Sequence, residues 1–112
     1  MREASRVDAA VLASAATGAA WGHAGEQLNV TVLAWPAGHV VDEHVNEARE
    51  VVLVGIAGAG VLVVEDAEHD LHAGVVLVVP RGARRTMRAG DEGIAYVSAH
   101  QARGLLQVTP RS

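Results

Sequence analysis

The sequence predicts an all-β domain, an antiparallel β-barrel or β-sandwich preceded by a short helical segment. Short runs rich in Val, Leu and Thr recur along the chain, and turns containing glycine or proline separate them at regular spacing. At 112 residues the chain has the length of one domain with one core. A hydrophobic fraction of 50% without any phenylalanine predicts that this core is aliphatic.

The first expected elements lie before residue 28. Asp8 can cap a short helix over residues 8–16, because an aspartate side chain accepts hydrogen bonds from the free N–H groups at a helix start. Gly18 follows as a stop signal. The segment around Trp21 predicts a lead-in strand, whose indole would plug the barrel or contact another subunit.

Strands are expected over most of the remaining chain. The run at 28–35 alternates Leu, Val, Val and Ala with Asn, Thr, Leu and Trp, and it ends at Pro36. Turn-forming residues predict a polar turn at 66–70 and a hairpin connection at 89–93. The other strands are expected at residues 38–45, 50–56, 61–65, 75–79, 84–89, 94–99 and 105–109, with a glycine turn at 58–60.

Composition excludes several classes of chemistry. All nine basic residues are arginines and cysteine is absent, which removes lysine Schiff bases, thiol nucleophiles, disulfides and thiolate metal ligands. The net charge of −4 argues against a nucleic-acid partner. No run approaches the ~18 consecutive apolar residues of a membrane span. Glu3 and Asp8 stand where a secretory signal carries positive charge, so we expect a cytoplasmic protein.

Two groups of spaced residues in the middle of the chain form motifs. The first group is Gly38, His44, Asn46 and Glu50, and the second is Gly74, Pro80 and Gly82. In this order and spacing they resemble the two motifs of the cupin family. The resemblance implies a jelly-roll β-barrel over residues 28–112, with an N-terminal extension over residues 1–27.

The chain departs from the family pattern at the metal ligands. Asn46 stands where the second histidine of the first motif belongs, and Arg85 stands where the histidine of the second motif belongs. The closing glycine of the first motif is displaced from Ala57 to Gly58. Of the usual metal-binding set, only His44 and Glu50 remain.

These substitutions predict a metal-free pocket for a small organic anion. The resemblance implies that His44, Asn46 and Glu50 point into the barrel. Arg85 would take the place of the metal, pair with Glu50 and bind the anion, because a buried arginine needs a counter-charge. Side-chain alternation adds further expected ligand-binding residues, which are Met87 on the strand of Arg85 and Tyr96, Ser98 and His100 on the next strand.

Three other expectations follow from the same residues. In a metal-dependent enzyme of the dioxygenase, isomerase or lyase class, His44 and Glu50 would bind one divalent transition metal with a further ligand such as His100. Without metal, His44 and Glu50 could act as catalytic acid and base. In a non-catalytic structural protein, Glu50 and Arg85 would form a buried network. In each case we expect a homodimer that hides exposed strand edges.

Overall fold

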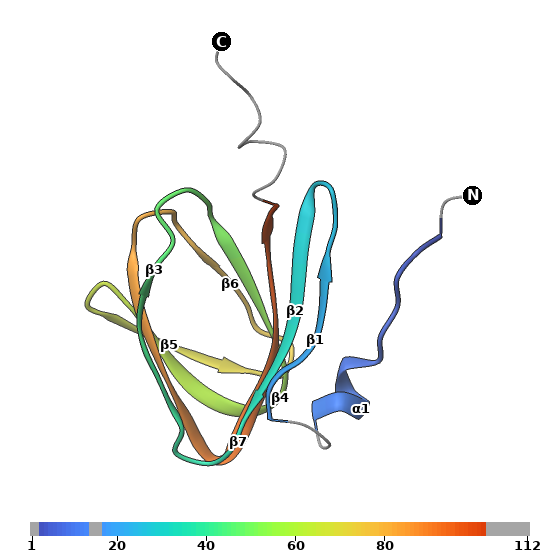
Figure 1. The fold of residues 1–112 in the computed structure, drawn as a ribbon. Helices are drawn as coiled ribbons and strands as arrows, with labels where there is room; N and C mark the ends of the chain where they lie inside the picture. Colours follow the sequence, from blue (N-terminus) through green and yellow to red (C-terminus); the bar gives the residue numbers. More distant parts are fainter. Residues whose placement is uncertain (1–2, 14–16, 103–112) are drawn as a thin grey trace.

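The computed structural model describes residues 3–13 and 17–102 and contains one short helix and seven strands (Figure 1). All strand pairs are antiparallel. The predicted all-β jelly roll is thereby confirmed. The elements are α1 (Ala9–Ala13), β1 (Gly18–Ala24), β2 (Leu28–Trp35), β3 (Val40–Val45), β4 (Val51–Val64), β5 (Ala67–His72), β6 (Val76–Val79) and β7 (Arg84–Gln101).

Two long strands, β4 and β7, connect the two layers of the barrel. They pair with each other over almost their whole length, from Val51 opposite His100 to Val64 opposite Arg85. The first part of β4 pairs with β6, and its last part pairs with β5. Likewise, the first part of β7 pairs with β3 and its last part with β2. One layer therefore has the order β1-β2-β7-β4-β6 and the other has the order β3-β7-β4-β5.

The turns expected at 58–60 and 89–93 are wrong, because the chain bends there within continuous strands. Register shifts between Gly55 and Ala57 and between Gly58 and Gly60 mark the bend of β4 opposite β7. Gly58 has φ of 68° and Gly93 has φ of 77°, a left-handed conformation that favours glycine. A Cβ on Gly58 would collide with the carbonyl oxygen of Gly93. Glycines thus allow the two backbones to bend together at close approach.

The polar turn expected at 66–70 is also wrong for most of its length. A short turn at residues 65–66 is followed directly by β5, which pairs with β4 from Ala67 opposite Val64 to His72 opposite Ala59. Among the described strands β5 pairs with β4 alone, so it is an edge strand, and only its Leu71 is buried. Charged exposed residues are a common feature of edge strands, because they oppose pairing with other chains.

The N-terminal segment contributes a strand to the barrel sheet. Asp8 caps α1 as expected, since its Oδ1 accepts hydrogen bonds from the N–H groups of Ala10 and Val11 at 3.1 and 3.2 Å. The helix is described to Ala13, and residues 14–16 of the predicted helix lie outside the described residues. β1 pairs with β2 as an edge strand, and Trp21 lines a depression together with Val7 and Val30. The strand predicted at 105–109 also lies outside the described residues.

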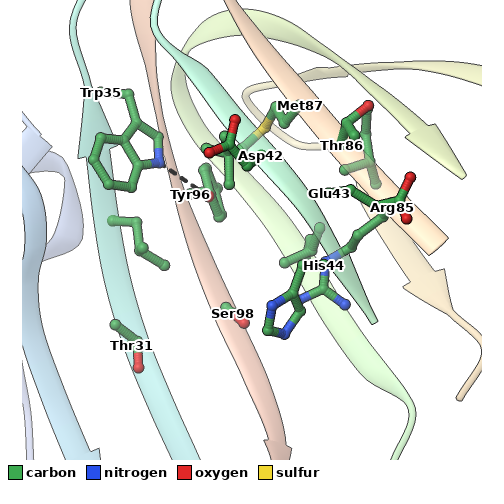
Figure 2. Close-up of a pocket in the computed structure, with 14 residues that line it drawn as sticks. Thr31, Trp35, Asp42, Glu43, His44, Arg85, Thr86, Met87, Tyr96 and Ser98 are labelled. Carbon is green, nitrogen blue, oxygen red and sulfur yellow. Dashed lines mark hydrogen bonds between the residues drawn. The ribbon is translucent and has the colours of Figure 1, made fainter. Parts of the chain in front are cut away.

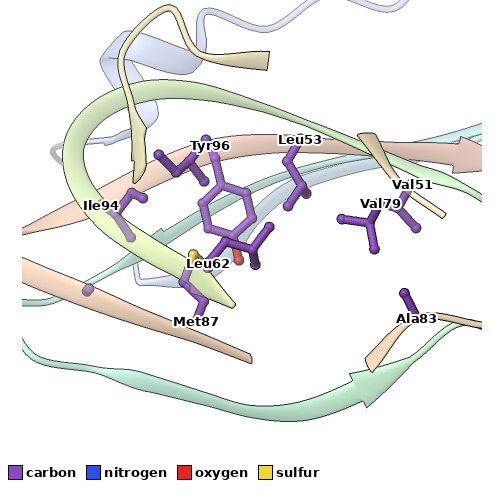
Figure 3. Close-up of a cluster of buried hydrophobic side chains, with 10 residues drawn as sticks. Val51, Leu53, Leu62, Val79, Ala83, Met87, Ile94 and Tyr96 are labelled. Carbon is purple, nitrogen blue, oxygen red and sulfur yellow. The ribbon is translucent and has the colours of Figure 1, made fainter. Parts of the chain in front are cut away.

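The core fills the space between the two layers and is mostly aliphatic, as the composition predicts (Figure 3). Leu62, with 2% of its surface exposed, and Leu71 are contributed by β4 and β5. Full burial of one such side chain stabilises the fold by roughly 1.5–3 kcal/mol. The cluster consists of Val51, Leu53, Leu62, Leu71, Val79, Ala83, Met87, Ala89, Ile94 and Tyr96. Within the described part of the chain, no helix has the length and apolar character needed to cross a membrane.

Candidate functional site

A cavity of about 450 Å³ opens between the two layers beside this core. Its volume lies within the range of about 300–1,000 Å³ that is typical of small-molecule sites. Apolar side chains and polar or charged side chains both form the wall (Figure 2). The lining residues are Thr31, Leu33, Trp35, Val41, Asp42, Glu43, His44, Leu53, Leu62, Arg85, Thr86, Met87, Tyr96 and Ser98.

Strand pairing explains how one wall of the cavity is built. In the β2–β7 pair, Thr31 lies opposite Ser98 and Leu33 lies opposite Tyr96. Cross-strand partners share a face, and alternate residues along a strand return to the same face. The inner set of β2 is therefore the one that carries the tryptophan, and the inner set of β7 includes the expected Tyr96 and Ser98. Alternation in the sequence divides the residues of β2 into two faces, and the structure shows that the face of Thr31, Leu33 and Trp35 is the inner one.

Arg85 and His44 meet on the opposite wall. They are directly paired residues of β7 and β3, and their side chains lie side by side (Figure 2). Arg85 is half-buried, and its Nη1 atom is inaccessible to solvent without a hydrogen-bond partner among the described residues. Burial lowers the pKa of the guanidinium below its ordinary value, and the neighbouring Tyr96 acts in the opposite direction. The cavity wall thus carries a partly desolvated cation with an unused donor.

Tyr96 provides a second polar group that is held in place. Its hydroxyl accepts a hydrogen bond of 3.1 Å from Nε1 of Trp35 (Figure 2). The indole in turn stacks on His39, with ring centroids 4.2 Å apart and planes 5° from parallel. Burial raises the pKa of the Tyr96 hydroxyl above its ordinary value of 10.0, while the Trp35 hydrogen bond and the Arg85 charge oppose this shift. The hydroxyl is therefore protonated at neutral pH and retains its own O–H group for donation.

The expected positions of Glu50 and Asn46 need correction. Glu50 is exposed and lines a separate depression, so it meets neither Arg85 nor His44. Oδ1 of Asn46 instead accepts hydrogen bonds from the N–H groups of Ala48 and Arg49, at 3.2 and 3.1 Å. This local turn leads into β4 with Arg49 buried and Glu50 outside. The buried Glu50–Arg85 network and the His44–Glu50 acid–base pair are therefore not formed.

His100 lies on the expected face of β7 but outside the cavity. It pairs with Asn29 of β2 and lines a neighbouring depression together with His44 and Asn46. Its Nδ1 lies 3.0 Å from the carbonyl oxygen of Gln101. Met87, in contrast, is buried in the core and lines the cavity, as expected from alternation.

The donor set of the barrel does not fit the metal centre of the alternative hypothesis. Among the described residues, no three His, Cys, Asp or Glu side chains are grouped closely enough to hold an ion. The remaining residues of the chain, 1–2, 14–16 and 103–112, contain no His, Cys, Asp or Glu. A stable site generally needs three or four protein ligands, and of the expected ones only His44 lines the cavity.

Two acidic residues of the cavity, Asp42 and Glu43, escaped prediction from the sequence. Both are exposed residues of β3, next to a register shift between Val41 and His44. Such a bulge breaks the alternation of side chains, so consecutive residues can border the same cavity. The sequence shows three consecutive polar residues here, Asp42, Glu43 and His44. That all three border the cavity depends on the bulge, which the sequence does not reveal.

Comparison with solved structures gives the same fold with low sequence identity. KdgF from a Halomonas species is 16% identical with a TM-score of 0.68, over 77% of this chain and 78% of that protein. The Cnp3 cupin domain of Schizosaccharomyces pombe is 18% identical with a TM-score of 0.65, over 72% of this chain and 60% of the other. An RmlC-like cupin protein from Desulfovibrio desulfuricans is 23% identical with a TM-score of 0.63, over 70% and 76% of the two chains.

The fold is that of the cupins. This confirms the architecture that the two sequence motifs imply. No protein-family model matches the sequence, and no curated protein matches it either. Because cupin folds, like other common folds, can carry unrelated activities, the function of this cupin barrel has to be argued from its own cavity.

Proposed function

We propose that this cupin-fold protein binds a small organic anion in the cavity between its two layers, with Arg85 as the anchor. The observation that carries the proposal is the buried Nη1 of Arg85, which lacks a partner among the described residues on the wall of a cavity of ligand size. A buried donor without a partner costs about 1–3 kcal/mol. A carboxylate bound to this guanidinium would remove that cost and add charge-assisted hydrogen bonds.

The surrounding groups limit the chemistry of the ligand. Arg85 and His44 supply a polar end, while Leu33, Leu53 and Met87 supply apolar contacts. The O–H group of Tyr96 can add a hydrogen bond to the anion or to another acceptor of the ligand.

Asp42 and Glu43 border the cavity on the β3 side and disfavour additional negative charge there. The favoured ligand therefore combines an anionic group at Arg85 with an apolar body and, near Asp42 and Glu43, a hydroxyl or amino group.

Isothermal titration with a series of small carboxylic acids tests the proposal. We expect Arg85→Met to weaken binding by about tenfold or more, because charge-assisted hydrogen bonds contribute about 1.5–3 kcal/mol. Arg88→Met is the matched control, since Arg88 is exposed on the same strand and lies outside the cavity. Arg85→Met should also fold at least as stably as the wild type, because an apolar side chain replaces a partly buried cation that has an unpaired donor.

Asp42→Asn provides a second, opposite readout. Removing this negative charge should strengthen the binding of simple carboxylates such as butyrate. The proposal is refuted if no carboxylate of the series releases heat or stabilises the wild type, or if Arg85→Met binds the acids as tightly as the wild type does.

The homodimer expected from the sequence stays a prediction. Its best support is the pair of valines Val76 and Val78 on β6, each with 60% of its surface exposed. β6 pairs only with β4, so its other edge is open among the described strands. A molecular mass of one chain in solution at micromolar concentration would contradict the dimer.

A further inference from the structure

Arg49 is the one charged side chain that is buried within residues 3–13 and 17–102, with 5% of its surface exposed. Two of its guanidinium atoms, Nε and Nη2, are inaccessible to solvent and have no hydrogen-bond partner among these residues. The one ion pair found in this part of the chain joins Arg84 and Glu65 and lies elsewhere. Arg49 is therefore a desolvated cation without a counter-charge from the described chain.

The local backbone explains why Arg49 points inward. The Asn46 side chain holds a turn that includes Arg49. Arg49 thereby lies two residues before Val51, the buried first residue of β4. Residues 49 and 51 share a face of an extended chain. Val51 pairs with His100 of β7, so Arg49 enters the barrel at the end where His100 lies.

A depression of about 440 Å³ lies at this end of the barrel, and Arg49 forms part of its wall. Asn29, His44 and His100 also line it, and His44 borders the main cavity as well. The amide of Asn29 and a ring N–H of His44 can donate hydrogen bonds to an anion. The Nδ1–H of His100 points to the carbonyl oxygen of Gln101, so His100 can donate from Nε2 when its ring is protonated. The acidic residue on this wall, Glu47, directs Oε1 toward the turn at Gly82 and makes no ion pair with Arg49.

We propose that Arg49 anchors a second binding site, which takes an oxyanion such as a carboxylate or phosphate group between Arg49, His44 and His100. A buried guanidinium favours an oxyanion because it offers several N–H donors in a fixed geometry and loses its hydration on burial. The site does not depend on Arg85, so it stands independently of the function proposed for the cavity. The oxyanion is either a free inorganic ion or the second anionic group of a ligand whose first group lies at Arg85.

Inorganic phosphate is the first probe, because it tests the site without a known organic ligand. In ¹⁵N-labelled wild-type protein, the Nε–H signal of Arg49, assigned through its loss in Arg49→Lys, should shift and saturate with phosphate. The Nε–H signal of the exposed Arg88 should not respond in the same way. The rise in melting temperature with phosphate concentration gives an apparent affinity, which Arg49→Met should lower about tenfold. Arg88→Met, which changes an exposed arginine outside the depressions that Arg49 lines, should retain the wild-type affinity.

Two results would overturn the site. One is an Arg49 Nε–H signal that does not move with phosphate in the wild type, a measurement that does not require any variant to be stable. The other is an Arg49→Met protein that keeps the full phosphate-dependent stabilisation.

Succinate and butyrate then distinguish the two sources of the oxyanion. If one ligand spans both sites, succinate should shift the Arg49 and Arg85 signals together and bind more tightly than butyrate. If the second anion is separate, phosphate should shift Arg49 with butyrate already bound. The cavity proposal fails separately, if carboxylates do not shift the Nε–H signal of Arg85. The second site fails if phosphate does not shift the Nε–H signal of Arg49.

Discussion

Raising the pH above about 10 should destabilise this protein through Tyr96. The chain has one tyrosine and neither lysine nor cysteine. Arginines stay protonated in this range, and an α-amino group titrates near pH 8. Tyr96 is therefore the one side chain whose ordinary pKa falls close to 10.

The sign of the effect follows from burial. With 5% of its surface exposed, Tyr96 holds its proton more tightly in the native state than in the unfolded state, because burial raises its pKa. The stability from neutral Tyr96 is fully present below the unfolded pKa of about 10 and is lost as the pH rises through the native pKa. Between these two pKa values the free energy of unfolding should fall by up to about 1.4 kcal/mol per pH unit.

Two measurements test this reasoning. The absorbance of tyrosinate reports the native titration of Tyr96 directly, and urea unfolding at successive pH values reports the slope. Tyr96→Phe is the control and should show no such loss between pH 10 and the native pKa. Arg85→Met should raise the titration midpoint further, because the Arg85 charge lowers the pKa of Tyr96. A native midpoint at or below 10.0, or an equal slope in Tyr96→Phe, would refute the argument.

Three further predictions concern the fold. Leu62→Ala should lower the free energy of unfolding by about 2–5 kcal/mol in urea titrations, whereas Val40→Ala, at an exposed position, should change it little; equal losses would contradict the assigned core. Gly58→Ala should destabilise the bend between the layers, because its φ is 68° and its Cβ would meet a carbonyl oxygen of β7; an unchanged melting temperature would argue against the bend. Glu65→Gln should leave stability near that of the wild type, since its ion pair with Arg84 is half-exposed; a large loss would show that the pair matters more than its exposure indicates.

Side-chain alternation predicted the site best where strands run without interruption. Met87, Tyr96 and Ser98 line the cavity. Alternation grouped Met87 with Arg85 and Tyr96 with Ser98, but it did not decide whether the face of Tyr96 is the inner one. Alternation alone left open which set of β2 faces inward, and pairing of Thr31 with Ser98 decides it.

Prediction failed where local hydrogen bonds or bends shift the alternation. The family spacing puts Glu50 inward, but the turn made by the Asn46 side chain brings Arg49 inward instead. Glycine-rich stretches fit a hairpin as well as a bulged bend, so the sequence did not distinguish two separate strands from one bent strand at Gly58 or Gly93. The deciding factor in each case is a contact between segments distant in sequence or a single side-chain-to-backbone hydrogen bond.

The sharing of β4 and β7 by both layers has a consequence for folding kinetics. Their pairing brings residues 51–64 against residues 84–101, so neither layer can be completed by a local hairpin alone. Such non-local pairing requires a long loop to close before its contacts stabilise the chain, which slows folding of β-rich proteins. Because both layers contain the same two strands, they should form and open as one unit, and amide protons on the two sides of the bend should exchange with similar protection.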